Sequence, residues 1–154
     1  MTSVAATTHF PFLTCQWKCG DGDEGHPHAT LQGARDGACI VNYNHAFLEA
    51  SGLPPSVVDT CHFSVTCDME SVKLWVHWRA STAGEVEHHM KRIGFYVIRD
   101  DQGDPENPGV KPFRARLRNI LEWAQGPRLA RFHSAIARLT NDRQQAKRQK
   151  TSAS

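Results

Sequence analysis

Apolar and polar residues alternate along the segment Phe10–Lys18, FPFLTCQWK, as they do in a β-strand. Successive side chains of a strand point to opposite faces, so the odd-numbered residues, among them Leu13 and Cys15, share one face. The even-numbered residues share the other face, which ends in polar Gln16 and Lys18. We therefore expect these two polar side chains to point to one spot at the end of the strand.

Residues 29–51 show helical spacing instead. Gly33 and Gly37 lie one turn apart and are poor helix formers, which indicates the close approach of another backbone. Gly52, followed by two prolines, ends the helix. The predicted apolar stripe contains His45 in the same row as Leu31, Ala34, Ala38, Val41 and Leu48.

Strand-like alternation returns in residues 61–81, CHFSVTCDMESVKLWVHWRAS, and predicts a hairpin that turns at Asp68–Ser71. The segment HMKRIGFYVIRD, residues 89–100, predicts one more strand. Pro112 suits the first position of a helix that runs to about Ala124. Gly126–Pro127 is expected to end that helix and to start a second one.

The order of these elements predicts an α/β fold of the α+β sandwich type. It has a small central mixed sheet of about four strands, a long helix after the first strand and two C-terminal helices. We expect residues 10–141 to form a single domain and residues 1–9 to form a flexible N-terminus. Residues 142–154 contain no apolar residue beyond alanine and predict a disordered basic tail.

Charge is distributed unevenly along the 154 residues. Residues 1–110 carry 7 Lys/Arg and 14 Asp/Glu, whereas residues 111–154 carry 11 Lys/Arg and 2 Asp/Glu. An acidic body with a basic end is typical of nucleic-acid binding, although two oppositely charged faces that neutralise each other give the same split. Without a long apolar run or a secretory signal, the protein is expected away from membranes, in the nucleus or the cytoplasm.

Metal binding is not predicted. Five cysteines, an odd number, indicate reduced thiols. The set Cys15, Cys19, His26 and His28 has no standard zinc spacing, so a zinc-stabilised interaction protein is a third-ranked hypothesis. The loop DGDEGHPHATLQ begins like a calcium loop, but His26 and Gln32 replace its turn glycine and its bidentate glutamate.

Gln16 and Lys18 have the spacing of a known type of catalytic pair. A carboxylate at the first position and a lysine at the second suit metal-dependent phosphodiester hydrolysis, where the carboxylate holds Mg²⁺ and the lysine stabilises charge at phosphorus. The neutral amide of Gln16 cannot replace an ionised ligand. Two interpretations stay open, a decayed site and a polar strand end that reaches solvent.

Five segments follow one another in a characteristic order: FPFLTCQWK, ATLQGARDGA, FSVTCDMESVKLWVHW, HHMKRIGFYV and FRARLRNILEWAQGPRLARFHSAI. In this order, over residues 10–139, they resemble a domain of unknown function from filamentous fungi that is similar to the PD-(D/E)XK, or restriction-endonuclease-like, superfamily. The resemblance implies a restriction-endonuclease-like fold. It also implies that Gln16, Lys18 and Gln32 mark a relic of the family's catalytic site.

Two departures from the family bear on activity. The glutamate of the family's Glu-x-Lys motif is Gln16 here, and no acidic residue precedes it to replace the superfamily's upstream aspartate. We therefore expect a truncated domain whose first strand is an exposed edge, open to a partner chain or a second copy.

Two functions follow. The first is a non-catalytic module with a nuclease-like core that needs no cofactor and binds protein or nucleic acid. The second is a Mg²⁺-dependent nuclease that takes carboxylates from Asp21, Asp23 or Glu24 or from a partner chain. The missing acids favour the first, because such a site normally needs two carboxylates. Nucleic acid would be contacted by arginines of the C-terminal helices, namely Arg114, Arg118, Arg128 and Arg131.

Overall fold

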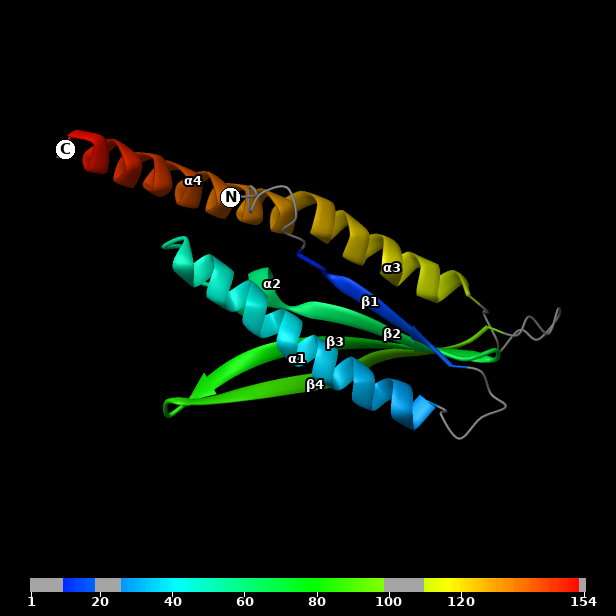
Figure 1. Ribbon diagram of the computed structural model, residues 1–154. Coiled ribbons are helices and arrows are strands. Elements are labelled where there is room, and N and C mark those ends of the chain that lie inside the picture. The colour runs from blue at the N-terminus through cyan, green and yellow to red at the C-terminus, as the bar shows by residue number, and fades with distance from the viewer. Residues whose placement is uncertain (1–9, 19–25, 99–109, 153–154) are drawn as a thin grey trace.

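Figure 1 shows the computed structural model, which describes residues 10–18, 26–98 and 110–152. It combines a four-stranded mixed sheet with long helices, which confirms the predicted fold class. In chain order the elements are β1 (Leu13–Trp17), α1 (His26–Ala50), α2 (Val57–Thr60), β2 (His62–Cys67), β3 (Ser71–Thr82), β4 (Glu85–Val97), α3 (Lys111–Trp123), the π-helical turn η2 (Ala124–Arg128) and α4 (Leu129–Ser152).

The sheet has the strand order β1-β2-β3-β4. The crossover through α1 makes β1 parallel to β2, with Gln16 opposite Thr66, and the other pairs are antiparallel. Within the described residues β1 therefore forms the edge that we expected. The hairpin turn at Asp68–Ser71 is also confirmed, because β2 pairs with β3 directly across it.

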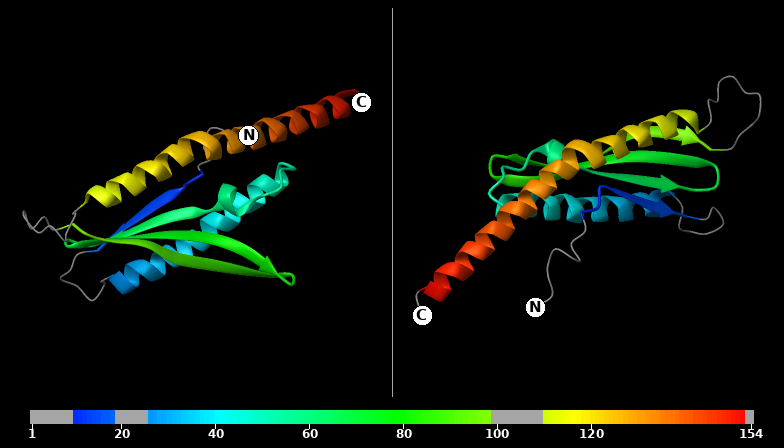
Figure 2. Two further views of the ribbon diagram at one scale, coloured as in Figure 1. Left: turned by 180° about the vertical axis from the view of Figure 1, so that it is seen from behind. Right: turned by 90° about the horizontal axis from the view of Figure 1, so that it is seen from above.

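The two faces of the sheet are covered by different helices. Side chains of β2 and β3 such as Val65 and Leu74 pack with Ile120 of α3 in the main apolar core. Their neighbours Ser64 and His77 point to the other face, where Gly33 and Gly37 of α1 lie against them. Figure 2 shows these two helices on different sides of the strands.

α1 differs from its prediction in its start and in its buried face. It begins at His26, three residues early, and it ends as predicted before Gly52, whose φ of 70° suits glycine. Leu31 is 70% exposed. The two glycines lie in the buried row instead, because the sheet approaches the helix along them; the buried residues are Ala29, Gly33, Gly37, Val41, Asn44 and Leu48.

The C-terminal region forms one continuous helix from α3 through η2 to α4, as Figures 1 and 2 show. Gly126–Pro127 was expected to break it, but the missing N–H of Pro127 is accommodated by the π-helical turn. Residues 142–152, predicted as a disordered tail, continue α4 to Ser152. No helix among the described residues is long and apolar enough to span a membrane.

Candidate functional sites

The predicted strand-end pair lies where β1 meets α1. Gln16 points toward the helix, and its Nε2 donates a hydrogen bond to Asp36 Oδ2 over 3.4 Å. Its Oε1 is buried without a hydrogen-bond partner and lies near Gly33. Lys18 is half-buried, and its backbone N–H donates to the carbonyl oxygen of Cys67 over 3.0 Å. Gln16 is therefore part of the packing between strand and helix.

Gln32, the third residue of the predicted site, is half-buried on α1 next to Gly33. Among the described contacts, no hydrogen bond joins it to Gln16. Asp36, one turn further along α1, was not among the predicted site residues, although its spacing from Gln32 places both on one side of the helix. Its Oδ1 lies 3.7 Å from Nε of Arg35. One carboxylate therefore stands beside Gln16.

A metal site is not formed by the part of the chain that the structure describes. No group of three or more His, Cys, Asp or Glu there could hold an ion. Asp21, Asp23 and Glu24, the alternative carboxylates, lie outside the described residues. Of the zinc set, Cys15 has its Sγ 3.6 Å from Sγ of Cys67, and His26 instead pairs with the carboxylate of Asp68, so the two have separate partners.

Polar side chains fill the interface between the sheet and α1. Thr14 Oγ1 lies 3.0 Å from His62 Nε2, and Ser64 Oγ lies 2.7 Å from His77 Nε2. The two imidazole rings are 5.7 Å apart. Burial lowers the pKa of His62 to about 4, with the neighbouring His77 as a further cause, and burial likewise lowers the pKa of His77 to about 4. Both imidazoles are therefore neutral at pH 7.

Ser64 and His77 combine a hydroxyl with an imidazole, as a nucleophile and its base do. However, Ser64 is fully buried and His77 is 2% exposed, so a substrate has no access to them. Gly37 lies against the ring: a Cβ there would be 2.3 Å from Nδ1 of His77. The glycine spacing in the sequence did indicate a close approach, but the approaching groups are side chains rather than a backbone.

The four predicted arginines do not share one surface. Arg114 and Arg118 are exposed on α3. Arg128 is buried, with 4% of its surface exposed. Arg131 contacts the segment that leads into α2, because its Nη2 donates a hydrogen bond to the carbonyl oxygen of Pro54 over 2.9 Å. The π-helical turn adds a residue to the helical repeat and so changes which side chains of α4 face the body.

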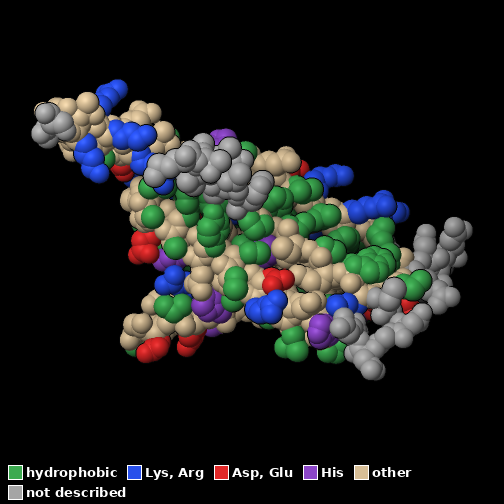
Figure 3. Space-filling view, in the orientation of Figure 1, with side chains coloured by type: hydrophobic (Ala, Val, Ile, Leu, Met, Phe, Trp, Pro, Cys, Tyr) green, Lys and Arg blue, Asp and Glu red, His purple; other side chains and the backbone are tan. Residues whose placement is uncertain are grey.

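Other cations extend the exposed basic surface. α3 contributes Lys111, Arg114, Arg116 and Arg118, and α4 contributes Arg138, Arg143, Lys147, Arg148 and Lys150. The only acidic residues in these two helices are Glu122 and Asp142. Figure 3 shows Lys and Arg side chains around the end of α4 that projects from the body. This distribution favours a polyanionic partner.

The projecting end of α4 is exposed on all sides. Every residue from Thr140 to Ser152 is exposed, and Ala146 is the only apolar one. Figures 1 and 2 show this end extending beyond the sheet and α1. A helix without an apolar stripe cannot dock by burying hydrophobic surface, so its charged groups must supply any affinity.

Comparison with known proteins identifies the family but not an activity. Residues 1–136 match the model of a domain of unknown function, DUF7924, and the chain belongs to that family. No curated protein and no solved structure matches the chain significantly.

Proposed function

We propose that this chain is a non-catalytic nucleic-acid-binding module that contacts phosphates with the exposed cations of α3 and α4. The observation that supports this most strongly is the concentration of exposed Lys and Arg on one long helix whose last turns project without an apolar stripe. Lys and Arg bind nucleic-acid backbones by displacing condensed counterions, which requires exposure rather than a pocket. Such a partner is consistent with a nuclear or cytoplasmic protein.

We further propose that the core is a decayed relative of the PD-(D/E)XK nucleases. Two observations support this: Gln16 and Lys18 end a strand that α1 connects to a parallel neighbour, and Asp36 is the carboxylate beside Gln16. The alternative is a Mg²⁺-dependent nuclease that uses acids from residues 21–24 or from a partner chain. It predicts DNA cleavage in Mg²⁺ or Mn²⁺ that Lys18→Ala abolishes, whereas the binding proposal predicts no cleavage.

Three double variants of equal charge change test the binding proposal: Arg114→Glu/Arg118→Glu on α3, Lys147→Glu/Arg148→Glu on α4 and Lys91→Glu/Arg92→Glu on β4. All six residues are exposed. Fluorescence anisotropy with a labelled DNA duplex gives the Kd of each variant at several salt concentrations. The α3 and α4 variants should bind about tenfold or more weakly, and each lost phosphate contact should reduce the salt slope by about 0.9.

The β4 variant is the matched control, because it changes net charge equally but lies on a strand of the sheet and not on α3 or α4. Its affinity should stay within about twofold of wild type at physiological salt, where distant charges are screened. Equal losses in all three variants would show that net charge alone attracts DNA, and this would contradict a defined interface.

A second candidate function is protein interaction at the β1 edge. In the parallel ladder, Phe12 and Lys18 bond toward β2, so by alternation the backbone groups of Leu13, Cys15 and Trp17 point away from it. Trp17 is also 59% exposed. Light scattering would test for a second copy at this edge: a dimer in wild type should dissociate in Trp17→Lys, because an edge lysine opposes strand pairing.

A further inference from the structure

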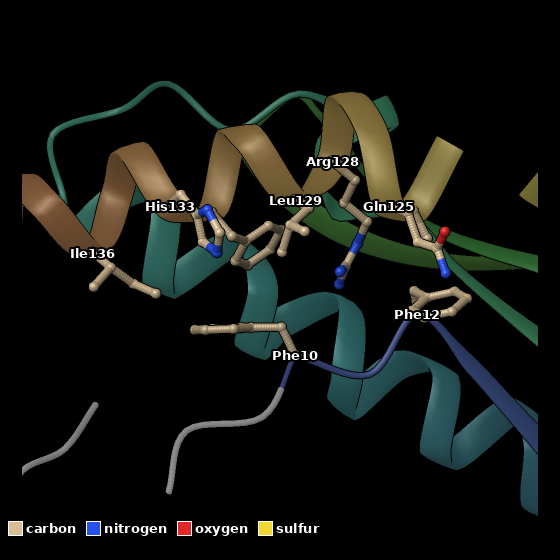
Figure 4. Close-up of a pocket in the computed structure, with 9 residues that line it drawn as sticks. Phe10, Phe12, Gln125, Arg128, Leu129, His133 and Ile136 are labelled. Atoms are coloured by element: carbon tan, nitrogen blue, oxygen red, sulfur yellow. The ribbon is translucent and has the colours of Figure 1, made fainter. Parts of the chain in front are cut away.

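A pocket of about 360 Å³ lies between the segment that leads into β1 and the helix at η2 and α4. Figure 4 shows Phe10 and Phe12 on one side and Leu129 and His133 on the other, with Arg128 pointing between them. The walls are mainly apolar, and the volume is that of a site for a small organic ligand.

Arg128 is buried in this pocket, and no acidic residue among those that the structure describes pairs with it. Its guanidinium carbon lies 4.5 Å from the ring centroid of Phe132 and also faces the rings of Phe12 and Trp123. Its one hydrogen bond within the described residues runs from Nη2 to the carbonyl oxygen of Pro11 over 3.3 Å. The Nε atom is buried and has no partner.

Within the described residues, these contacts leave the charge and some N–H donors of Arg128 without partners, so packing alone does not account for its burial. Burial lowers the pKa of Arg128 to about 10, so the side chain is still charged at pH 7. A buried charge needs an opposite charge and acceptors for its donors. The aromatic rings recover part of this cost by cation–π attraction, but they accept none of the remaining N–H groups in the plane of the guanidinium. Residues 1–9, MTSVAATTH, contain no Asp or Glu that could supply the missing anion.

We propose that this pocket binds a monocarboxylate with an apolar body. A carboxylate matches the planar, forked donors of a guanidinium and neutralises its single charge. A dianionic phosphate would retain one uncompensated charge beside apolar walls. A carboxylate attached to an apolar body occurs in free aliphatic or aromatic acids and at the C-terminal residue of a polypeptide. This site is separate from the proposed nucleic-acid surface, because that surface consists of exposed cations and Arg128 is buried.

Calorimetric titrations with matched probes test the proposal. Octanoate and an acetylated dipeptide ending in phenylalanine represent the two sources, and octanamide and the amidated dipeptide are their uncharged controls. At least one acid should bind wild type with a Kd below about 1 mM, and its amide should bind about tenfold or more weakly. The acid that binds identifies the source.

Variants locate the binding. Arg128→Met should weaken the binding of the acid until its Kd equals that of the amide. Arg138→Met is the control, because it removes an arginine of the same continuous helix that donates to the carbonyl oxygen of Gly52, and it should leave the Kd unchanged. Leu129→Trp narrows the mouth at a position that is 43% exposed, so it should fold and lose binding even if Arg128→Met does not fold. Equal binding of acid and amide, unchanged binding by Leu129→Trp, or no binding of either acid at about 5 mM would overturn the proposal.

Discussion

Polar side chains gather in two regions of this protein, the interface between α1 and the sheet and the long C-terminal helix. At the α1 interface they are buried and bonded to one another, as Ser64 is to His77. On α3 and the end of α4 they are exposed and nearly all of one sign. The first region uses polarity to fix the packing of a helix, whereas the second presents charge to solvent, where we propose that nucleic acid binds.

The difference shows that residue type alone is a weak guide to whether a polar side chain of this protein is buried or exposed. The polar pair at the end of β1 looked like a site, but Gln16 is engaged with α1. Conversely, residues 142–154 were predicted as a disordered basic tail, but α4 carries their cations on a regular helix as far as Ser152. Perturbing the first region should change stability, and perturbing the second should change binding.

Acid should produce the largest effect, and it should act on the α1 interface. The unfolded chain protonates its histidines near pH 6.5, whereas His62 and His77 stay neutral in the folded protein down to about pH 4. Unfolding therefore takes up protons in this window. The stabilising contribution of these two imidazoles should be complete above pH 6.5. The free energy of unfolding should then fall by on the order of 3 kcal/mol per histidine as the pH approaches 4.

Urea denaturation at pH 7, 6, 5 and 4 measures this dependence. His62→Gln should reduce the pH dependence, and His88→Gln, which makes the same substitution at an exposed position, is its control. A free energy of unfolding that stays constant from pH 7 to 4 would show that the two imidazoles are not buried as neutral groups.

Gly37→Ala should have the next largest effect. The added Cβ would lie 2.3 Å from Nδ1 and 2.4 Å from Cγ of His77, so the whole ring must move and its bond to Ser64 is strained. We expect a loss of about 3 kcal/mol, measured by urea denaturation. Gly126→Ala, where nothing lies within 4 Å of the new Cβ, is the matched control and should be neutral or slightly stabilising. Equal stability of the two variants would contradict the close contact with His77.

Ser64→Ala should cost about 2 kcal/mol, because it leaves a buried nitrogen of His77 without its partner. Ser81→Ala, at an exposed position of β3, should change stability by less than about 0.5 kcal/mol. The difference between these two alanine variants in thermal denaturation isolates the value of the buried hydrogen bond. If the two alanine variants are equally stable, the hydroxyl of Ser64 is not needed to satisfy the imidazole of His77.

Gln16→Glu should have a smaller effect that depends on metal. The new carboxylate would lie beside Asp36, now 3.4 Å from Gln16, and repulsion should cost about 1 kcal/mol. Mn²⁺ should restore that stability in thermal denaturation, and adding Asp36→Asn should remove the response. If Mn²⁺ does not raise the stability of Gln16→Glu, the strand end lacks the geometry of a metal site as well as the charge.

Local chemistry explains which parts of the fold could be predicted. Asp68 makes its turn with side-chain bonds: its Oδ1 accepts from the backbone N–H groups of Glu70 and Ser71 over 2.9 and 2.7 Å. Gly52 ends α1 in a backbone conformation with positive φ. Both signals lie within a few residues of the feature that they specify, so the sequence predicts the hairpin turn and the helix end directly.

The burial of polar groups could not be predicted in the same way. His62 and His77 can lie inside because Thr14 and Ser64, each on a neighbouring strand, bond the Nε2 atom of one ring each, and hydropathy carries no information on such pairs. Arg128 turns inward because η2 changes the helical repeat at Gly126–Pro127, where the sequence predicted a break. Asp36 became visible as a neighbour of Gln16 only after the packing of α1 on β1 was known.

The most direct test of the proposed division of roles is a titration of the ¹⁵N-labelled protein with a short DNA duplex, followed by backbone amide chemical shifts. We expect the shifts to concentrate on α3 and the end of α4, residues 111–118 and 138–152, while the amides around Gln16, Lys18 and Asp36 stay unchanged. Shifts centred on those three residues, with α3 and α4 unaffected, would contradict a nucleic-acid surface on these helices and would indicate binding at the strand-end site instead.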